Sequence, residues 1–201
     1  MTHHMNGLAE ARMQLAIEEG ELARGSTGDN PWVGCVITDT HDRVLGRGHT
    51  QGPGEDHAEI GALHQARALH MEVRGGTMYS TLEPCSFHGR TPACSRVIVA
   101  SGIRRVVIGM RDPHPRVDGE GVRILRSSGI EVTEGVAEHL VRRQLGPWVL
   151  AQHPHEVRHR ARELARTLKL AEVAAAIADI YAIDIAAALA AVTPSDVPGG
   201  A

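Results

Sequence analysis

Hydrophobic residues recur at two alternating periods along the first three quarters of the chain. From Leu8 to Arg24 they fall mostly on one helical stripe among charged residues, which predicts an amphipathic opening helix with Gly25 as its stop. Short apolar runs bounded by turn residues predict strands at WVGCVIT, RVLGRG, GTMYST, RRVVIGM and IEVTEG. Helical spacing predicts helices at HAEIGALHQARALH, PACSRVIVASG, GEGVRILRSSG and AEHLVRRQLGPWVL.

This alternation of strands and helices over residues 8–150 indicates a layered α/β domain around a largely parallel sheet. A chain of 201 residues has room for one such domain of about 150 residues and an appendage. We therefore expect a domain over residues 1–150 and a helical C-terminal extension with a flexible end over residues 151–201.

The extension differs from the domain in composition. Residues after Gln152 are first basic and dotted with histidines, and then dominated by alanine, isoleucine and leucine. This pattern predicts two helices joined near Leu170. A broad apolar helix of this kind normally packs on something, so a dimer contact or a lid over the main domain is favoured over a separate activity.

Charge and hydropathy narrow the class of partner. Lys and Arg total 21 against 24 for Asp and Glu, which gives no basic excess for nucleic acid or a membrane surface. One Phe, two Tyr and two Trp also leave few rings for base stacking, which disfavours polynucleotide editing. No apolar run reaches the roughly 18 residues of a membrane span, and the first ten residues lack signal-peptide features. We expect a cytoplasmic protein with a small-molecule substrate.

Two of the three cysteines lie in the stretch TLEPCSFHGRTPAC, residues 81–94, where eight residues separate Cys85 from Cys94. An odd number of cysteines without an export signal disfavours a disulfide framework and leaves thiol chemistry or metal binding. Cys35 lies inside an apolar strand and is expected to be a core residue rather than a ligand.

A third ligand is needed because zinc is usually held by thiolates and imidazoles, with one position open in hydrolytic sites. The best candidate is His57, which opens a predicted helix and is separated from Cys85 by 27 residues. Glu59 follows two positions later and is suited to act as a nonligand proton carrier beside the metal. An alternative metal cluster is conceivable in the extension, at His153, His155 and His159.

Together these motifs resemble the pyrimidine deaminase domain of riboflavin biosynthesis, within the cytidine-deaminase-like superfamily. The resemblance covers roughly residues 8–150 and rests on NPWVGCVIT, GRGHTQGPGEDHAEIGAL, YSTLEPCSFHGRTPAC, GIRRVVIGMRDPHPRVDGEG and SGIEVTEG. It implies a three-layer α/β/α sandwich that self-associates as a dimer or tetramer. It also implies one zinc ion on His57, Cys85 and Cys94, with Glu59 as proton shuttle. The implied substrate is a ribosylaminopyrimidine phosphate that loses a ring amino group as ammonia.

The resemblance also suggests substrate contacts. It places Asn30 near the ring, and Arg90 and Thr91 near the ring or phosphate; Arg90 suits a phosphate because its guanidinium forms paired hydrogen bonds. Asp112 lies in the turn DPHPRVDGEG. Its side chain could either shape this loop or contact the substrate, and the sequence does not distinguish the two roles.

Two positions depart from the family pattern around the substrate. Phe87 stands where the family usually has histidine, with His88 one place later. Thr50 stands where the family tends to have a ring-contacting histidine, with His49 one place earlier.

These departures leave alternatives open. A related deaminase could act on another aminopyrimidine, a purine or a guanidine compound, and a different class of protein would use the zinc only to stabilise a binding or regulatory module. Bacterial family members commonly carry a reductase domain, for which the last 50 or so residues are too few. No organic cofactor is expected, because no phosphate-cradling Gly-rich motif occurs.

The proposed role of Arg90 makes a direct prediction. Arg90→Ala should weaken binding of a phosphorylated substrate far more than binding of its dephosphorylated form, because only the former offers oxygens to the guanidinium. Binding constants for the two compounds measure the difference. Equal losses would show that Arg90 does not read the phosphate.

Overall fold

A mixed five-stranded sheet, in the order β2-β1-β3-β4-β5, organises the first part of the chain. The computed structural model describes residues 2–87, 93–114 and 117–192. The strands are β1 (Gly34–Thr38), β2 (Val44–His49), β3 (Thr77–Leu82), β4 (Arg105–Met110) and β5 (Glu131–Glu134). The helices are α1 (Thr2–Glu21), α2 (Ala58–Ala68), α3 (Cys94–Ser101), α4 (Glu120–Ser127), α5 (Glu138–Gln152), α6 (Pro154–Leu164), α7 (Leu170–Tyr181) and α8 (Ile185–Ala191).

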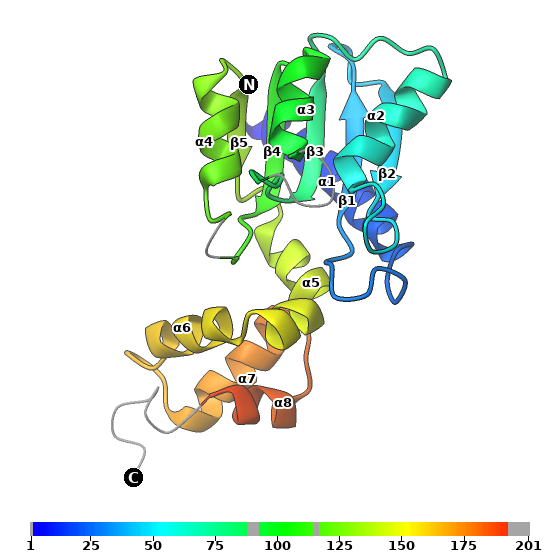
Figure 1. Cartoon of the computed structure of the whole chain (residues 1–201). Helices are drawn as coiled ribbons and strands as arrows, with labels where there is room; N and C mark the ends of the chain where they lie inside the picture. The colour runs from blue at the N-terminus through cyan, green and yellow to red at the C-terminus, as the bar shows by residue number, and fades with distance from the viewer. Residues whose placement is uncertain (1, 88–92, 115–116, 193–201) are drawn as a thin grey trace. The chain divides into compact units, whose positions relative to one another are not determined.

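Helices cover both faces of this sheet, which confirms the expected α/β/α sandwich. Helices α2, α3 and α4 lie in front of the strands in Figure 1, and α1 lies behind them. Glycines permit the closest approaches. A Cβ atom at Gly34 would lie 1.8 Å from the carbonyl oxygen of Ala16 on α1, and one at Gly48 would lie 2.3 Å from the nitrogen of Ala62 on α2.

The sheet is less parallel than expected. Strands β3, β4 and β5 are parallel, but β1 is antiparallel to both of its neighbours, β2 and β3. The turn between β1 and β2 is too short for the crossover that a parallel pair needs, so the hairpin must reverse the chain. Strand β3 then lies beside β1 rather than beside β2, because α2 carries the chain across the sheet.

The chain divides into two compact units, residues 1–141 and 142–201, and the division lies within α5. The second unit has its own apolar core, which includes Leu145, Val157, Ile177 and Tyr181. Gly146 brings α5 against the end of α7, since a Cβ atom there would lie 1.7 Å from the carbonyl oxygen of Tyr181.

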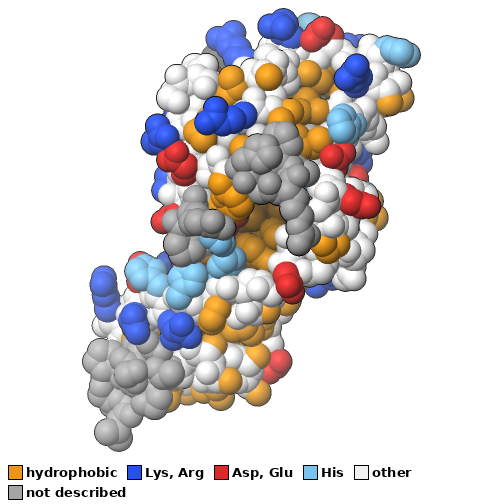
Figure 2. All heavy atoms as spheres, in the orientation of Figure 1, with side chains coloured by type: hydrophobic (Ala, Val, Ile, Leu, Met, Phe, Trp, Pro, Cys, Tyr) orange, Lys and Arg blue, Asp and Glu red, His pale blue; other side chains and the backbone are white. Residues whose placement is uncertain are grey.

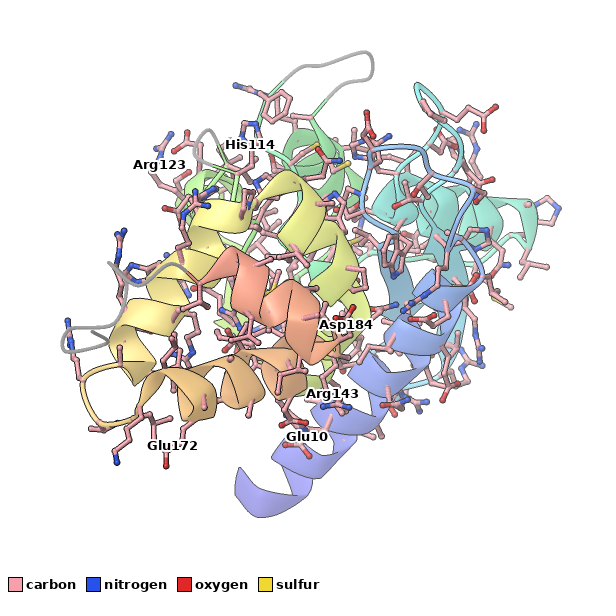
Figure 3. The ribbon with its side chains drawn as sticks, turned by 90° about the horizontal axis from the view of Figure 1, so that it is seen from below. Glu10, His114, Arg123, Arg143, Glu172 and Asp184 are labelled. Carbon is pink, nitrogen blue, oxygen red and sulfur yellow. The ribbon has the colours of Figure 1, made fainter. Side chains whose placement is uncertain are left out.

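The apolar end of the chain forms two helices where one was expected. Ala182 ends α7 in a left-handed conformation, with φ 49°. Asp184 then starts α8 by accepting a hydrogen bond from the Ala187 amide at 2.8 Å (Figure 3). Within the described residues, no single helix has the length and hydropathy of a membrane span, and α7 and α8 reach both only as a pair bent by 113°.

The contact between β2 and α2 can be tested by adding one methyl group. Gly48→Ala should lower the free energy of unfolding by about 2–3 kcal/mol, because its Cβ atom would overlap the backbone of α2. Denaturant unfolding measures this. Gly7→Ala is the matched control, since Gly7 has open space around it and should lose no stability. Equal stability of the two variants would contradict the packing described.

Candidate metal centre and active site

Three segments bring His57, Cys85 and Cys94 together at one end of the sheet. His57 is the N-cap of α2, Cys85 lies in the loop after β3, and Cys94 is the first residue of α3. Their ligand atoms all lie within 4.8 Å of one another. The sequence motifs singled out the same three residues, and their role as metal ligands stays a prediction.

The spacing of these atoms fits a tetrahedral metal ion. His57 Nδ1 lies 3.8 Å from Cys85 Sγ and 3.4 Å from Cys94 Sγ. Ordinary Zn–S and Zn–N bond lengths at a tetrahedral angle require a separation of about 3.6 Å. Two sulfur atoms and one imidazole nitrogen also form a donor set that zinc prefers, so the residues present fit this metal.

The alternative ligands are not brought together. In the described part of the chain no second group of three such ligands converges, so His153, His155 and His159 form no cluster of this kind. The ring of His153 instead packs edge-on against Trp148, with centroids 4.7 Å apart. Cys35 is a buried free cysteine outside the metal cluster, as expected for a core residue.

The start of α3 stabilises the thiolate form of Cys85. The Cys94 amide donates to Cys85 Sγ at 3.3 Å, and the Ser95 amide donates to the Cys85 carbonyl oxygen at 3.2 Å. Hydrogen bonds from Cys94 and His57 outweigh burial and lower the pKa of Cys85 to about 4. The hydrogen bond to Cys85 in turn raises the pKa of His57 to about 9.

The second thiol behaves oppositely. The pKa of Cys94 is raised well above its usual range, because its proton is hydrogen-bonded to Cys85 and because it is buried. Without a metal ion, Cys85 therefore loses its proton more readily than Cys94, and His57 holds its proton more firmly than a free imidazole. A metal ion must displace the protons of His57 and Cys94 to bind all three ligands.

Glu59 has the properties of a proton carrier. It lies in the first turn of α2 and is only 4% exposed. Burial, followed by the negative charge of Cys85, raises its pKa to about 7, and the charge of His57 opposes this shift. A carboxyl group that titrates near neutral pH can both accept and return a proton during turnover.

Two residues proposed as substrate contacts are already engaged by the fold. Thr50 is buried, and its hydroxyl accepts a hydrogen bond from the Val33 amide at 3.2 Å. The ring of His49 lies against α1, with Nδ1 2.9 Å from Glu19 Oε1. These bonds position the end of β2, and contact of either residue with substrate stays a prediction.

Phe87 and Asp112 lie on loops that meet beyond the ends of β3 and β4. Phe87 is 38% exposed, and its ring centroid is 6.1 Å from that of His114, which is labelled in Figure 3. The Asp112 carboxylate accepts a hydrogen bond from the His114 amide at 2.8 Å. Burial raises the pKa of the Asp112 carboxyl group to about 6. Both observations are compatible with a role beside the substrate.

The remaining predicted contacts are less defined. The Asn30 carbonyl accepts a hydrogen bond from the Thr27 hydroxyl at 2.7 Å, and its side chain is partly exposed. His88, Arg90 and Thr91 lie outside the described residues. On the face of residues 1–141 visible in Figure 2, Arg side chains are scattered among acidic and neutral ones.

Sequence reasoning missed Glu83, which comes two residues before Cys85. Its side chain is 3% exposed, and its carboxylate accepts amide hydrogen bonds from Gly119 and Val122 at the start of α4. The sequence did hold a signal for this residue, a charged side chain at the end of an apolar strand. A carboxylate in such a buried place needs hydrogen-bond donors, which indicates a structural contact with another segment.

Comparison with known proteins agrees with this geometry. The fold and ligand set are those of zinc-dependent deaminases, and a family model for the cytidine and deoxycytidylate deaminase zinc-binding region matches residues 7–110. The chain is 43% identical over 130 residues to the riboflavin biosynthesis protein RibD of Aquifex aeolicus, covering 65% of this chain and 35% of that protein. It therefore spans about a third of the length of this relative.

A shorter relative matches over most of its length. The diaminohydroxyphosphoribosylamino-pyrimidine deaminase of Buchnera aphidicola subsp. Schizaphis graminum is 44% identical, over 62% of this chain and 82% of that protein. The crystal structure of a Thermotoga maritima diaminohydroxyphosphoribosylaminopyrimidine deaminase and 5-amino-6-(5-phosphoribosylamino)uracil reductase is 41% identical, with a TM-score of 0.65, over 70% of this chain and 40% of that one. The chain belongs to the family of riboflavin-biosynthesis pyrimidine deaminases.

The ligand assignment can be tested by metal content. We expect about one zinc ion per chain in the purified protein and a large loss in Cys94→Ser, because the variant replaces a thiolate ligand with a hydroxyl. Elemental analysis with thermal melting, before and after chelation, measures both occupancy and stability. Cys35→Ala is the control and should keep its zinc. Full zinc retention by Cys94→Ser would refute the assignment.

Proposed function

We propose that this chain binds one zinc ion and catalyses the hydrolytic deamination of a diaminopyrimidine ribosylamine phosphate. The observation that carries the proposal is a buried carboxyl group with a pKa of about 7, Glu59, beside three convergent ligands. The substrate class is the one for which the Buchnera relative is named.

Zinc on His57, Cys85 and Cys94 would act as a Lewis acid that lowers the pKa of a water molecule from 15.7 to about 7. Glu59 would take a proton from the attacking water and deliver it to the ring nitrogen beside the amino-bearing carbon. Glu59 would then take the proton of the hydroxyl group added to the ring carbon and deliver it to the amino nitrogen, which would leave as neutral ammonia. The bond from the ring carbon to the amino nitrogen then breaks, and the products are a ring carbonyl and ammonia.

The protein around Glu59 supports this role. In the metal-free protein, burial and then the negative charge of Cys85 raise the pKa of its carboxyl group to about 7, close to the working pH. The substrate contacts proposed around it are Asn30, His49, Thr50, Phe87 and Asp112 within the described residues, and His88, Arg90 and Thr91 beyond them.

A related deaminase reaction on another aminated ring is the second candidate. It is favoured by Thr50 and His49, because the hydroxyl of one is bonded to Val33 and the ring of the other faces Glu19. With the Thr50 hydroxyl and the His49 ring held in these contacts, the site would recognise a substrate ring through other groups than the family pattern uses. A zinc-stabilised binding module is disfavoured, because a purely structural site has no use for a titrating carboxyl group at its side.

Assembly and location complete the proposal. Self-association as a dimer or tetramer rests on the family resemblance and on the apolar residues of the extension. Some of these side chains are exposed on α8, where Ile185 and Leu189 face solvent in the chain taken alone. A cytoplasmic location is in keeping with the three free cysteines, since disulfide bonds are typical of exported proteins.

Replacement of the proton carrier tests the mechanism. Glu59→Gln should lower the rate of ammonia release from the riboflavin-pathway diaminopyrimidine ribotide by at least about 100-fold, because an amide cannot exchange the proton. Zinc content and melting temperature should stay close to those of the unmodified protein.

Glu55→Gln is the matched control, since Glu55 is exposed in the same segment and its carboxylate accepts a hydrogen bond from the nearby Gly52 amide. It should retain full activity. Unchanged turnover in Glu59→Gln would refute the mechanism. Absence of ammonia from well-folded, zinc-loaded wild-type protein would instead point to the second candidate, and other aminated heterocycles should then be offered.

A further inference from the structure

Glu83 is a buried carboxylate that the proposed chemistry does not use. It directly follows β3, and its amide continues the strand pairing by donating to the Met110 carbonyl oxygen at 3.0 Å. Its side chain points away from solvent and is 3% exposed. A charged group in such a place is costly unless its oxygens are hydrogen-bonded.

Both oxygens of Glu83 are satisfied by the start of α4. Oε2 accepts from the Gly119 amide at 2.9 Å, and Oε1 accepts from the Val122 amide at 3.2 Å. Helix α4 has no side-chain cap of its own, because its N-cap residue is Gly119. Glu83 therefore caps this helix from 36 residues away, and its negative charge complements the positive end of the helix.

Steric contact reinforces these hydrogen bonds. A Cβ atom at Gly121 would lie 2.0 Å from the carbonyl oxygen of Pro84, so the first turn of α4 rests on the backbone next to Cys85. Gly119 adopts a φ of 85°, which a residue with a side chain rarely adopts. The segments LEPC, residues 82–85, and DGEG, residues 118–121, thus pack directly against each other.

Cys85 consequently lies between two helix starts. Helix α3 holds it directly, through the Cys94 and Ser95 amides. Helix α4 holds it through Glu83, two residues earlier in the chain. The loop that carries Asp112 connects β4 to the start of α4. The Glu83 carboxylate therefore links the segment just before Cys85 to the end of the loop that carries Asp112.

We propose that Glu83 is a positioning residue that fixes the metal ligand Cys85 relative to the loop carrying Asp112. Loss of its paired hydrogen bonds should loosen the metal site and the substrate loop together. The effect on substrate rests on the proposed function, whereas the effect on the metal does not.

Glu83→Gln is the main test. Glutamine has the same length but keeps only one acceptor oxygen, so one amide of α4 loses its partner. We expect the zinc dissociation constant, measured by chelator competition, to rise about 10- to 100-fold, as is typical for groups that orient ligands. KM should rise as well, and hydrogen exchange at the Gly119 and Val122 amides should accelerate.

Glu120→Gln is the matched control. Glu120 is the first residue of the same helix, and its partner is Arg123, with no link to Cys85. This variant removes the same charge from the start of α4 and should leave zinc affinity unchanged. Glu83→Asp provides a second variant in case glutamine prevents folding, because it keeps the charge but shortens the reach.

The proposal is overturned if Glu83→Gln, or Glu83→Asp where only that variant folds, binds zinc as tightly as the wild type. It is also overturned if Glu120→Gln weakens zinc binding equally. Zinc affinity is measured without substrate, so a wild-type protein that releases no ammonia would refute the proposed function and leave this test valid.

Discussion

The site depends on one electrostatic constraint: two thiols and an imidazole must give up their protons in a buried place. The fold meets it with hydrogen bonds to Cys85 from the Cys94 side chain, from His57 and from the Cys94 amide at the start of α3, which together lower the pKa of the Cys85 thiol to about 4. Placement of α2 and α3 on the same face of the sheet then brings His57 and Cys94 to this thiolate. The strand order and the close packing of helices on the sheet hold His57, Cys85 and Cys94 close together.

The same constraint explains why the neighbouring groups resist ionisation. Cys94 and Glu59 are buried next to a thiolate, and the pKa values of both are raised. Binding of a divalent cation would reverse the repulsion, since the charge of a metal favours the deprotonated forms around it. Folding of this end of the sheet, metal binding and proton release are therefore linked equilibria.

Local patterns in the sequence predicted what is local in the structure. The strands and most helices follow from periodicity, and the candidate ligands His57, Cys85 and Cys94 follow from short motifs. Interactions between distant residues left no such pattern: Glu83 bonds residues 36 and 39 positions away, and His49 reaches Glu19 at a separation of 30. The break before α8 was missed because alanine, the best helix former, surrounds the capping Asp184.

The contact between β2 and α2 has a mechanical consequence for the ligand. At Gly48 the strand meets the helix backbone to backbone, without a side chain between them. Side chains can absorb strain by changing rotamer, whereas two backbones in contact have no such soft coordinate. His57 begins this helix. Strand β2 and helix α2 are thus expected to move together, so that the thermal motion of His57 follows that of the sheet.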